Sequence, residues 1–462
     1  MDASLAVAEA ATAAAFSDLS FAAVDGAKRG LMDTVGVSLA ATGLGEDAGP
    51  IVDLVRENGG RPEATVIGYG GRTSAADAAF VFGALTHMLD YDDIVDSAVT
   101  HPSAAVVAAV FPLAERIGSV SGTELLTAVA IGQDLNVRLN LALRHHPPYY
   151  GWLPSINTIF GATLAAAKIL RLNADQAHAA LGLAMHQAGG SRQAGAGLGS
   201  SFRGIRDGFN ARTAVVSALL AQRGLRGDRD AFEGRYGLFN LHFRGDYDRE
   251  PLFDDLGTEF RGALAGQKPW PSCRFSHLFI SPLLGLLRKH DLHASDIAQI
   301  TAVSNDDLLE DQCEPHDIRA RPLHVIDAKR SLPFQLGKVV VNRGLTLADF
   351  TPTGLQDKAA IEVAERVGWR LDASAVGSAL GSGRVELELE DGRHLHAEAR
   401  SLPGSVDDPI RWPDLEDKFR ECAMHSVTPV GSNVIGEVTR ILRSLETQEN
   451  VDRIIPRLSA TS

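Results

Sequence analysis

Alanine-dense apolar segments recur through the first 265 residues, and they restrict the folds that this chain can adopt. The clearest is SAADAAFVFGALTHMLD, residues 74–90, which carries Ala and Phe on every face of a helix. A helix that is apolar all round has to be buried on all sides. Because Ala side chains are small, such helices approach one another closely. The pattern predicts a compact, largely helical array up to about residue 265.

Local signals predict further helices in this part of the chain. Ser121 and Glu124 make up a capping box, the side-chain pattern that starts a helix. The segments 160–172 and 173–189 read as a helical pair, and 211–224 ends in a glycine suited to a helix C-terminus. These signals agree with the helical array.

Composition excludes several classes of protein. Lys and Arg number 44 against 58 Asp and Glu, so the net charge is −14, which argues against non-specific nucleic-acid binding. The apolar N-terminal stretch lacks the basic start of a secretory signal, so we interpret it as the first helix. No apolar run is long enough for a membrane span. Three scattered cysteines without a CxxC pair fit a reducing compartment and predict a cytoplasmic protein.

The character of the sequence changes after residue 265. In residues 384–400, RVELELEDGRHLHAEAR, apolar and polar residues alternate around Asp391 and Gly392, which predicts a β-hairpin. Residues 296–304 supply another strand. Residues 361–369 predict a short helix. This stretch therefore reads as α+β.

A chain of 462 residues exceeds the usual size of a single hydrophobic core. The pattern predicts a mainly α protein: a large all-helical domain over 1–265 with an inserted, smaller α+β domain over 266–404. Residues 405–462 are helical again, and we expect them to return to the helical domain and complete it.

The segment HMLDYDDIVDSAVTHPS, residues 87–103, gathers Asp90, Asp92, Asp93 and His101. Carboxylates beside an imidazole suit proton transfer, whereas a capped, solvated loop has the same composition. Asp at a helix C-terminus opposes the macrodipole, and burial there raises its proton affinity. The following proline suits the first turn of the next helix. From these residues alone, both a site and a loop remain open.

The segment 189–208, GGSRQAGAGLGSSFRGIRDG, places Arg192, Arg203 and Arg206 among glycines. Its Gly-x-Gly portion follows no predicted strand, so a dinucleotide-binding loop is not indicated. Arginine forks suit carboxylate recognition. A basic surface loop is the alternative.

Two segments of the second domain carry further candidates. Lys268, Arg274 and His277 surround a proline-rich turn in residues 268–283, on the domain boundary where sites are often built. A linker with a partly buried histidine is the alternative. Lys329 follows in VIDAKRSLPF and points either to a pocket or to solvent.

Metal and nucleophile motifs are absent from the sequence. It contains no HExxH motif, so a bound metal is not indicated. It has no GxSxG or P-loop pattern. The histidines in helical patterns elsewhere read as structural; they are His178, His186 and His293.

Several stretches together resemble the MmgE/PrpD family, which includes 2-methylcitrate dehydratase, cis-aconitate decarboxylase and iminodisuccinate epimerase. The matching stretches are GLMDTVGVSLAA, GGRPEATVIGYGGRTSAADAAFVFGALTHMLDYDD, THPSAAVVAAVFPLAE, FGATLAAAKILRL, KPWPSCRFSHLFI, DAKRSLPF and LEDKFRECA. The resemblance implies a large helical domain built from both chain ends, an inserted α+β domain, a site in the cleft between them and a homodimer. It also implies that no metal or organic cofactor is used. The acidic charge and the lack of a long apolar run predict that neither nucleic acid nor membrane is a partner.

The resemblance implies chemistry as well: removal of a proton from carbon next to a carboxylate, followed by loss of a leaving group or reprotonation. Such a reaction needs a positioned base, and cations that hold the carboxylates as charge develops. The implied catalytic residues are Asp90, His101 and His277. The implied substrate-binding residues are Asp93, Arg203, Arg206, Lys268 and Lys329.

This chain departs from the family pattern at defined positions. Leu153 stands where many members carry His, and Arg203 and Arg206 stand for a Lys and a His. Arg is a poor general acid but binds carboxylates bidentately. An extra Asp96 lies between Asp93 and Thr100. The departures point to a substrate other than 2-methylcitrate or cis-aconitate.

Three functions stay open at this level. The first is a cofactor-independent, dehydratase-like lyase that acts on a small di- or tricarboxylate. The second is an epimerase or isomerase of a small polycarboxylate such as an iminodisuccinate-like compound, which needs two proton-transfer groups on opposite faces of one carbon. The third is a non-catalytic carboxylate-binding protein.

Overall fold

The alanine-dense segment around residues 74–90 forms helix α4 (Ala75–Thr86). Its N-cap is Ser74, whose hydroxyl accepts a hydrogen bond from the Asp77 amide. The helix packs against α10 (Phe202–Gln222) and α5 (Ala104–Ile117). A Cβ on Gly83 would lie 2.5 Å from the Asp207 carbonyl oxygen in α10. A Cβ on Gly208 would lie 2.6 Å from the Phe80 carbonyl oxygen in α4. Facing glycines therefore let the two backbones touch.

The computed structural model describes residues 2–399 and 401–459. The chain divides into two units, and each is described by itself. The first unit comprises residues 1–195, 201–267 and 411–462, and the second comprises 196–200 and 268–410.

The first unit is helical apart from the two-stranded β1–β2 ribbon. Its elements in the N-terminal half are α1 (Ala3–Ala13), α2 (Phe21–Leu44), α3 (Ala48–Asn58), β1 (Ala64–Thr65), β2 (Arg72–Thr73), α4 and α5. Next come α6 (Gly122–Leu141), α7 (Thr158–Ile169), α8 (Ala174–Met185), α10, α11 (Leu238–Phe243) and α12 (Glu250–Phe253). The C-terminal segment adds α19 (Trp412–Met424), α20 (Ser432–Arg443) and α21 (Ile454–Arg457). The short α9 (Gln193–Ala196) ends at the start of the segment that belongs to the second unit.

The predicted helix starts and ends in this unit can be compared with the structure. The capping box at Ser121 and Glu124 is present at the start of α6. Gly224, with φ +87°, follows the end of α10. However, α10 begins at Phe202 rather than at residue 211. The predicted glycine-rich loop is therefore helical from Phe202 onward.

The second unit combines helices with a four-stranded sheet. Its helices are α13 (His277–His290), α14 (Leu308–Cys313), α15 (His316–Ala320), α16 (Val325–Ala328), α17 (Leu332–Asn342) and α18 (Lys358–Ala364). Its strands are β3 (Ile297–Ser304), β4 (Val367–Leu371), β5 (Arg384–Leu389) and β6 (His394–Glu398), in the spatial order β4-β3-β5-β6. The mainly α fold with a small α+β portion is thus confirmed.

The predicted strands are present, and one predicted helix of this unit is wrong at its end. The hairpin is present as β5 and β6, antiparallel, with Val385 opposite Ala397 and a turn at Gly392. The strand predicted at 296–304 is β3. The predicted helix over 361–369 is wrong at its end, because residues 367–369 belong to β4, which pairs in parallel with β3. The helical pattern there ends at Ala364, and pairing with β3 decides the rest.

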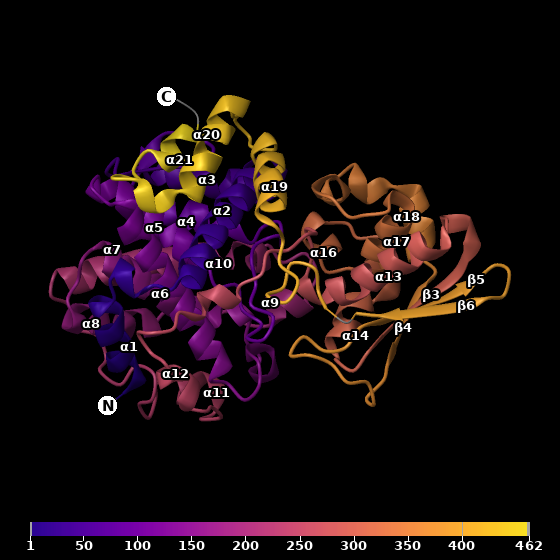
Figure 1. The fold of residues 1–462 in the computed structure, drawn as a ribbon, viewed down its shortest axis with the longest axis horizontal. Helices are drawn as coiled ribbons and strands as arrows, with labels where there is room; N and C mark the ends of the chain where they lie inside the picture. Colours follow the sequence, from indigo (N-terminus) through magenta and orange to yellow (C-terminus); the bar gives the residue numbers. More distant parts are fainter. Residues whose placement is uncertain (1, 400, 460–462) are drawn as a thin grey trace. The chain divides into compact units, whose positions relative to one another are not determined.

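The C-terminal segment packs inside the first unit. Helix α19 lies beside α2, and α20 packs against both (Figure 1). Residues from the two ends of the chain therefore share one core. This brings LEDKFRECA next to the long second helix.

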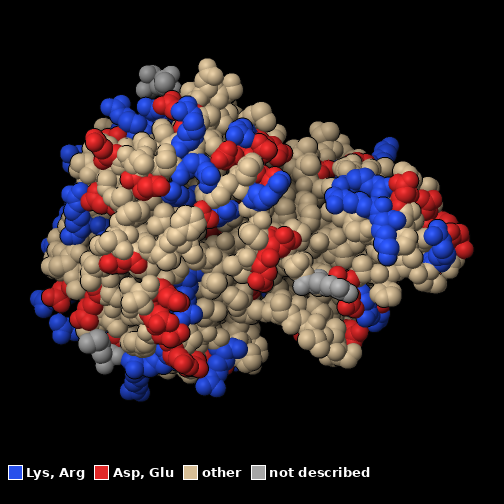
Figure 2. All heavy atoms as spheres, viewed as in Figure 1, with Lys and Arg blue, Asp and Glu red and all other residues tan. Residues whose placement is uncertain are grey.

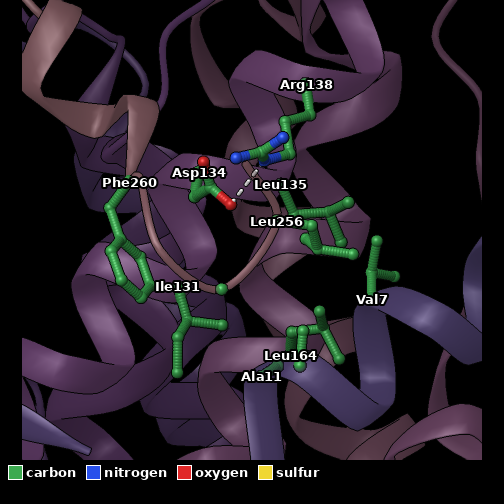
Figure 3. Close-up of a pocket in the computed structure, with 11 residues that line it drawn as sticks. Val7, Ala11, Ile131, Asp134, Leu135, Arg138, Leu164, Leu256 and Phe260 are labelled. Atoms are coloured by element: carbon green, nitrogen blue, oxygen red, sulfur yellow. Dashed lines mark hydrogen bonds and ion pairs between the residues drawn. The ribbon is translucent and has the colours of Figure 1, made fainter. Parts of the chain in front are cut away.

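An ion pair at the end of α6 fixes the loops that return to this core. Arg138 is fully buried; its Nε donates to Asp134 at 2.8 Å, and its other nitrogens donate to backbone carbonyls of residues 251–259. The cavity beside the pair, drawn in Figure 3, is about 20 Å³ and lined by Val7, Leu164 and Phe260 among others. It has room for about one water molecule and none for a substrate.

Acidic and basic side chains are interspersed on the face of the molecule that Figure 2 shows. None of the helices in residues 2–399 and 401–459 combines the length and the apolarity needed to cross a membrane.

Candidate active site

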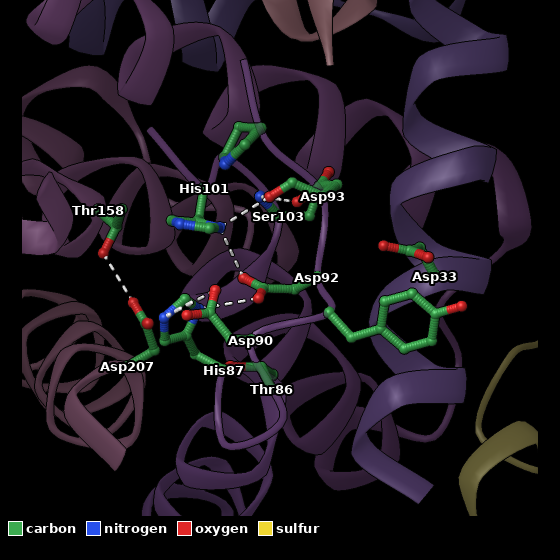
Figure 4. Close-up of polar contacts among 12 residues, drawn as sticks. Asp33, Thr86, His87, Asp90, Asp92, Asp93, His101, Ser103, Thr158 and Asp207 are labelled. Atoms are coloured by element: carbon green, nitrogen blue, oxygen red, sulfur yellow. Dashed lines mark hydrogen bonds and ion pairs between the residues drawn. The ribbon is translucent and has the colours of Figure 1, made fainter. Parts of the chain in front are cut away.

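The LDYDD segment leaves α4 in a tight turn. His87 is the C-terminal cap of α4, and the Asp90 amide donates to the His87 carbonyl at 2.9 Å. Asp90 has φ +50°, a left-handed conformation that Asp tolerates better than most residues. The turn points the side chains of His87, Asp90 and Asp92 toward one another (Figure 4). All three are buried.

Asp92 joins two histidines. Its Oδ1 lies 2.8 Å from His87 Nδ1, and its Oδ2 lies 2.9 Å from His101 Nδ1. The two imidazole rings meet edge to face, with centroids 4.5 Å apart. His101 Nδ1 also lies 2.9 Å from the Asp93 carbonyl oxygen. Asp92 is completely buried, whereas His101 keeps 7% of its surface exposed.

These contacts assign the protons. Both neighbours of His101 Nδ1 are acceptors, so in the neutral ring Nδ1 carries the hydrogen and Nε2 is the basic nitrogen. Burial, together with the charge of Arg206, lowers the pKa of His87 to about 3 and keeps that ring neutral. Burial alone would raise the pKa of Asp92. However, the two imidazoles and their hydrogen bonds outweigh burial and hold that pKa well below its usual range.

Asp90 forms an ion pair with an arginine of α10. Arg203 Nη2 donates to Asp90 Oδ2 at 2.6 Å, and Asp90 Oδ1 lies 3.7 Å from His87 Nε2. Arg203 is 9% exposed and Arg206 4%. Both arginines therefore lie buried on a helix, and the surface-loop alternative is wrong. Arg206 Nη1 donates to the Arg203 carbonyl at 2.7 Å.

A further carboxylate, Asp207, faces Arg206. Its Oδ2 lies 3.5 Å from Arg206 Nε, and Thr158 donates to its Oδ1 at 3.1 Å. Asn210 in turn donates to Thr158 at 2.9 Å. Burial raises the pKa of Asp207 although the charge of Arg206 opposes this. Arg206 thus has a carboxylate beside it, from the residue that follows it in the sequence.

Asp93 has different contacts from Asp90 and Asp92. Its carboxyl accepts a hydrogen bond from the Ser103 hydroxyl, and Gln133 donates to that hydroxyl at 2.7 Å. Burial and the nearby charge of Asp33 raise the pKa of Asp93 well above its usual range. Ser103 is the N-terminal cap of α5, so Pro102 precedes the cap. The prediction that this proline lies in the first turn of the helix is therefore wrong. Direct binding of substrate by Asp93 stays a prediction.

A metal is a second possible ligand of this cluster. In the described residues, 2–399 and 401–459, the ligand atoms of His87, Asp92 and His101 lie within 4.8 Å of one another. This spacing is close enough for the three side chains to hold one metal ion. Their irregular spacing matches no sequence motif. However, His87 Nδ1 is hydrogen-bonded to Asp92 and His101 Nδ1 to the Asp93 carbonyl, and the Arg206 charge lowers the pKa of His87. A positive charge beside the cluster disfavours a cation. The geometry therefore fits a hydrogen-bonded proton-transfer network better.

The remaining predicted site residues lie in the second unit, where Lys268, His277 and Lys329 are buried. Arg274 Nη1 lies 3.2 Å from His277 Nδ1. Because a guanidinium only donates, Nδ1 of His277 accepts and its Nε2 carries the proton. The Cys273 amide donates to the Lys329 carbonyl at 3.0 Å, so the proline-rich turn and the Lys329 segment lie side by side. Lys329 therefore does not point to solvent.

Two further positions from the sequence analysis, Leu153 and Arg192, also lie in the first unit. Leu153 is buried, and its amide donates to Gly190 at 2.7 Å. Arg192 is half-buried and near Pro148. Several buried residues of the network escaped prediction, among them His87, Ser103 and Asp207. For His87 a signal existed, because it precedes Asp90 by three residues, one helical turn.

Comparisons with known proteins were made for the whole chain. The family model described as the MmgE/PrpD N-terminal domain matches residues 6–250, and that of the MmgE/PrpD C-terminal domain matches residues 270–443. A cis-aconitate decarboxylase-like protein, oryM, of Aspergillus oryzae is 25% identical over 473 residues, covering 96% of this chain and 94% of that protein. A cis-aconitate decarboxylase of Aspergillus terreus is 26% identical over 401 residues, covering 76% and 79%.

Proposed function

Because this chain belongs to the MmgE/PrpD family, we propose that it is a cofactor-independent lyase that removes a proton next to a carboxylate of a small di- or tricarboxylate. The observation that carries the proposal is the orientation of His101. Asp92 and the Asp93 carbonyl oxygen lie against its Nδ1–H, which leaves Nε2 as the basic nitrogen of a residue that is 7% exposed. The lyase class also agrees with the named activity of the two Aspergillus relatives.

In the proposed reaction, His101 Nε2 takes the proton from carbon. Asp92 stays ionised and stabilises the imidazolium that forms, because its pKa lies well below neutrality. A base held in this way typically contributes about 10²- to 10⁴-fold to the rate. The negative charge that develops on the substrate carboxylate needs a cation nearby.

Arg203 is the proposed cation. In the free protein it holds Asp90. A substrate carboxylate can bind the same guanidinium by displacing Asp90. It can also bind the other guanidinium nitrogens while Nη2 keeps its bond to Asp90. Asp90, once released, can take up a proton from water and pass it to the departing hydroxyl, which then leaves as water. The predicted roles of Lys268 and Lys329 in binding, and of His277 as an acid, rest on the resemblance. With Nδ1 accepting from Arg274, the neutral His277 ring can donate a hydrogen bond through Nε2.

An isomerase is the second candidate, and Leu153 is the observation that favours it. Family members with His at this position have one more proton-transfer group, and Leu153 offers none. Simple exchange of a proton at one carbon needs no group that protonates a departing hydroxyl.

Incubation of the protein in D₂O with citrate, 2-methylcitrate, cis-aconitate and iminodisuccinate, each followed by NMR, tests these proposals. An alkene formed with loss of water supports the lyase. Deuterium at a carbon next to a carboxylate, without elimination, supports the isomerase instead. If no compound exchanges but one raises the melting temperature, the non-catalytic binding protein takes their place.

His101→Gln then tests the assigned base. Turnover should fall at least about 100-fold, while the substrate still raises the melting temperature. His178→Gln is the matched control, because His178 is also buried in the first unit but contacts Ser4 and the Arg229 carbonyl. Equal losses in both variants would contradict the role of His101.

A further inference from the structure

Lys418, on helix α19, places a buried ammonium group against the LDYDD segment. Its side chain is 6% exposed, and its Nζ lies 2.7 Å from Asp33 Oδ1 on α2. The same Nζ donates to the Tyr91 carbonyl at 2.8 Å and lies 3.7 Å from the centre of the Tyr91 ring. One cation therefore contacts an acid, a carbonyl and an aromatic face.

Tyr91 is the residue between Asp90 and Asp92. The Tyr91 carbonyl belongs to the planar peptide unit that joins Tyr91 to Asp92, so fixing that carbonyl restricts the backbone position of Asp92. Asp90 already has a left-handed backbone conformation, which surrounding contacts must hold in place. Lys418 supplies such a contact from the far end of the chain.

Asp33 connects the same cation to the other side of the segment. It is 2% exposed, and its charge acts on Asp93, two residues beyond Tyr91. Replacing Lys418 by a neutral residue would leave a buried carboxylate with less compensation beside Asp93. Both Asp33 and the Tyr91 backbone thus depend on one ammonium group.

We propose that Lys418 is a positioning residue for the reaction, which holds the Asp90–Asp93 segment through Tyr91 and Asp33 without touching the substrate. The inference rests on the proposed function, because it assumes that Asp90 and Asp92 serve catalysis. It assigns a role in the site to the C-terminal helix. It also gives the lysine of LEDKFRECA a role beyond packing.

Lys418→Met is the test variant, since methionine keeps the length and the apolar stem but removes the charge. With the substrate found in the D₂O panel, kcat should fall about 10- to 100-fold, because small misplacements of catalytic groups are costly. KM should change less than about threefold, because Arg203 and the other binding groups keep their places. Lys418→Arg keeps the charge and should recover part of the lost kcat.

Lys338→Met is the matched control. Lys338 is also buried and also paired with carboxylates, at 2.9 Å from Asp357 and 3.4 Å from Asp349, but it belongs to the second unit. The two variants should lose similar melting temperature. Only the Lys418 variant should lose kcat.

The outcomes separate the inference from the proposed function. If the wild type turns over no panel compound, or His101→Gln stays fully active, the proposed function fails. If His101→Gln is inactive but folded Lys418→Met keeps kcat within twofold, the positioning role is wrong. Should Lys418→Met not fold, the double variant Asp33→Asn/Lys418→Met removes both charges and should fold. Full activity of that variant would overturn the proposal, and a loss in kcat would support it.

Discussion

Arg203 and Asp90, 113 residues apart in the sequence, meet in a buried hydrogen bond of 2.6 Å. The arginine comes from α10 and the aspartate from the turn after α4, and these two helices touch through facing glycines. The pair satisfies both charges in the absence of substrate. A carboxylate ligand has to compete with Asp90 for the guanidinium.

Asp90→Asn should therefore bind a carboxylate ligand more tightly while losing turnover. The neutral amide releases Arg203, and a charge-assisted hydrogen bond is worth about 1.5–3 kcal/mol. Recovering part of it predicts about tenfold tighter binding. Isothermal titration with citrate measures this. Asp53→Asn, an exposed position in the same unit, is the control and should leave the affinity unchanged. Weaker binding by Asp90→Asn would show that Asp90 itself contacts the ligand.

His87 should make stability depend on pH in the acid range. Its pKa is about 3 in the folded protein against 6.5 for the free side chain. The unfolded chain therefore binds a proton below pH 6.5 that the folded protein rejects until about pH 3, and stability falls as pH falls through this window. His87→Asn keeps a donor where Nδ1 lies and cannot be protonated. Its melting temperature should fall less steeply than that of the wild type between pH 6.5 and 3. Parallel curves would mean that another group dominates.

Val99→Gly should cost little stability or raise it. Val99 has φ +45°, which is strained for a β-branched residue by about 1–3 kcal/mol. Glycine relieves this strain at an entropic cost of about 0.5–1 kcal/mol. Urea unfolding followed by far-UV circular dichroism gives the difference. In contrast, Val95→Gly, a fully packed position in the same loop, should lose about 3 kcal/mol. Equal losses in the two variants would contradict the strain.

Metal removal should leave the reaction intact. The histidines at Asp92 are held in hydrogen bonds with Arg206 nearby, which suits a proton network. Protein dialysed against a chelator should retain its kcat and its melting temperature, and elemental analysis should find far less than one metal per chain. Loss of activity that Zn²⁺ or Mn²⁺ restores would instead assign a metal to His87, Asp92 and His101.

The sequence predicted the helical majority, the hairpin at Gly392 and the family, because each leaves a local pattern: small apolar residues on all helical faces, strict alternation around Asp-Gly, and short motifs. It failed where pairing overrides local preference. Residues 367–369 continue a helical pattern, but they become strand because β3 offers an edge. Likewise, the glycines around Arg203 suggested a loop, whereas close packing on α4 makes them helical.

For the candidate site, the sequence alone determined which groups are available: Asp90, Asp92, Asp93 and His101 lie within twelve residues, and an imidazole beside carboxylates points to proton transfer. Only the tertiary structure decided what each group does. Asp92 lies against both histidines, Asp93 accepts a hydrogen bond from Ser103, and Asp90 forms an ion pair with an arginine of another helix. Protonation depends on burial and on charges brought from distant parts of the chain. The local sequence does not contain those distances. It therefore could not show that the pKa of Asp92 is lowered while the pKa of the adjacent Asp93 is raised.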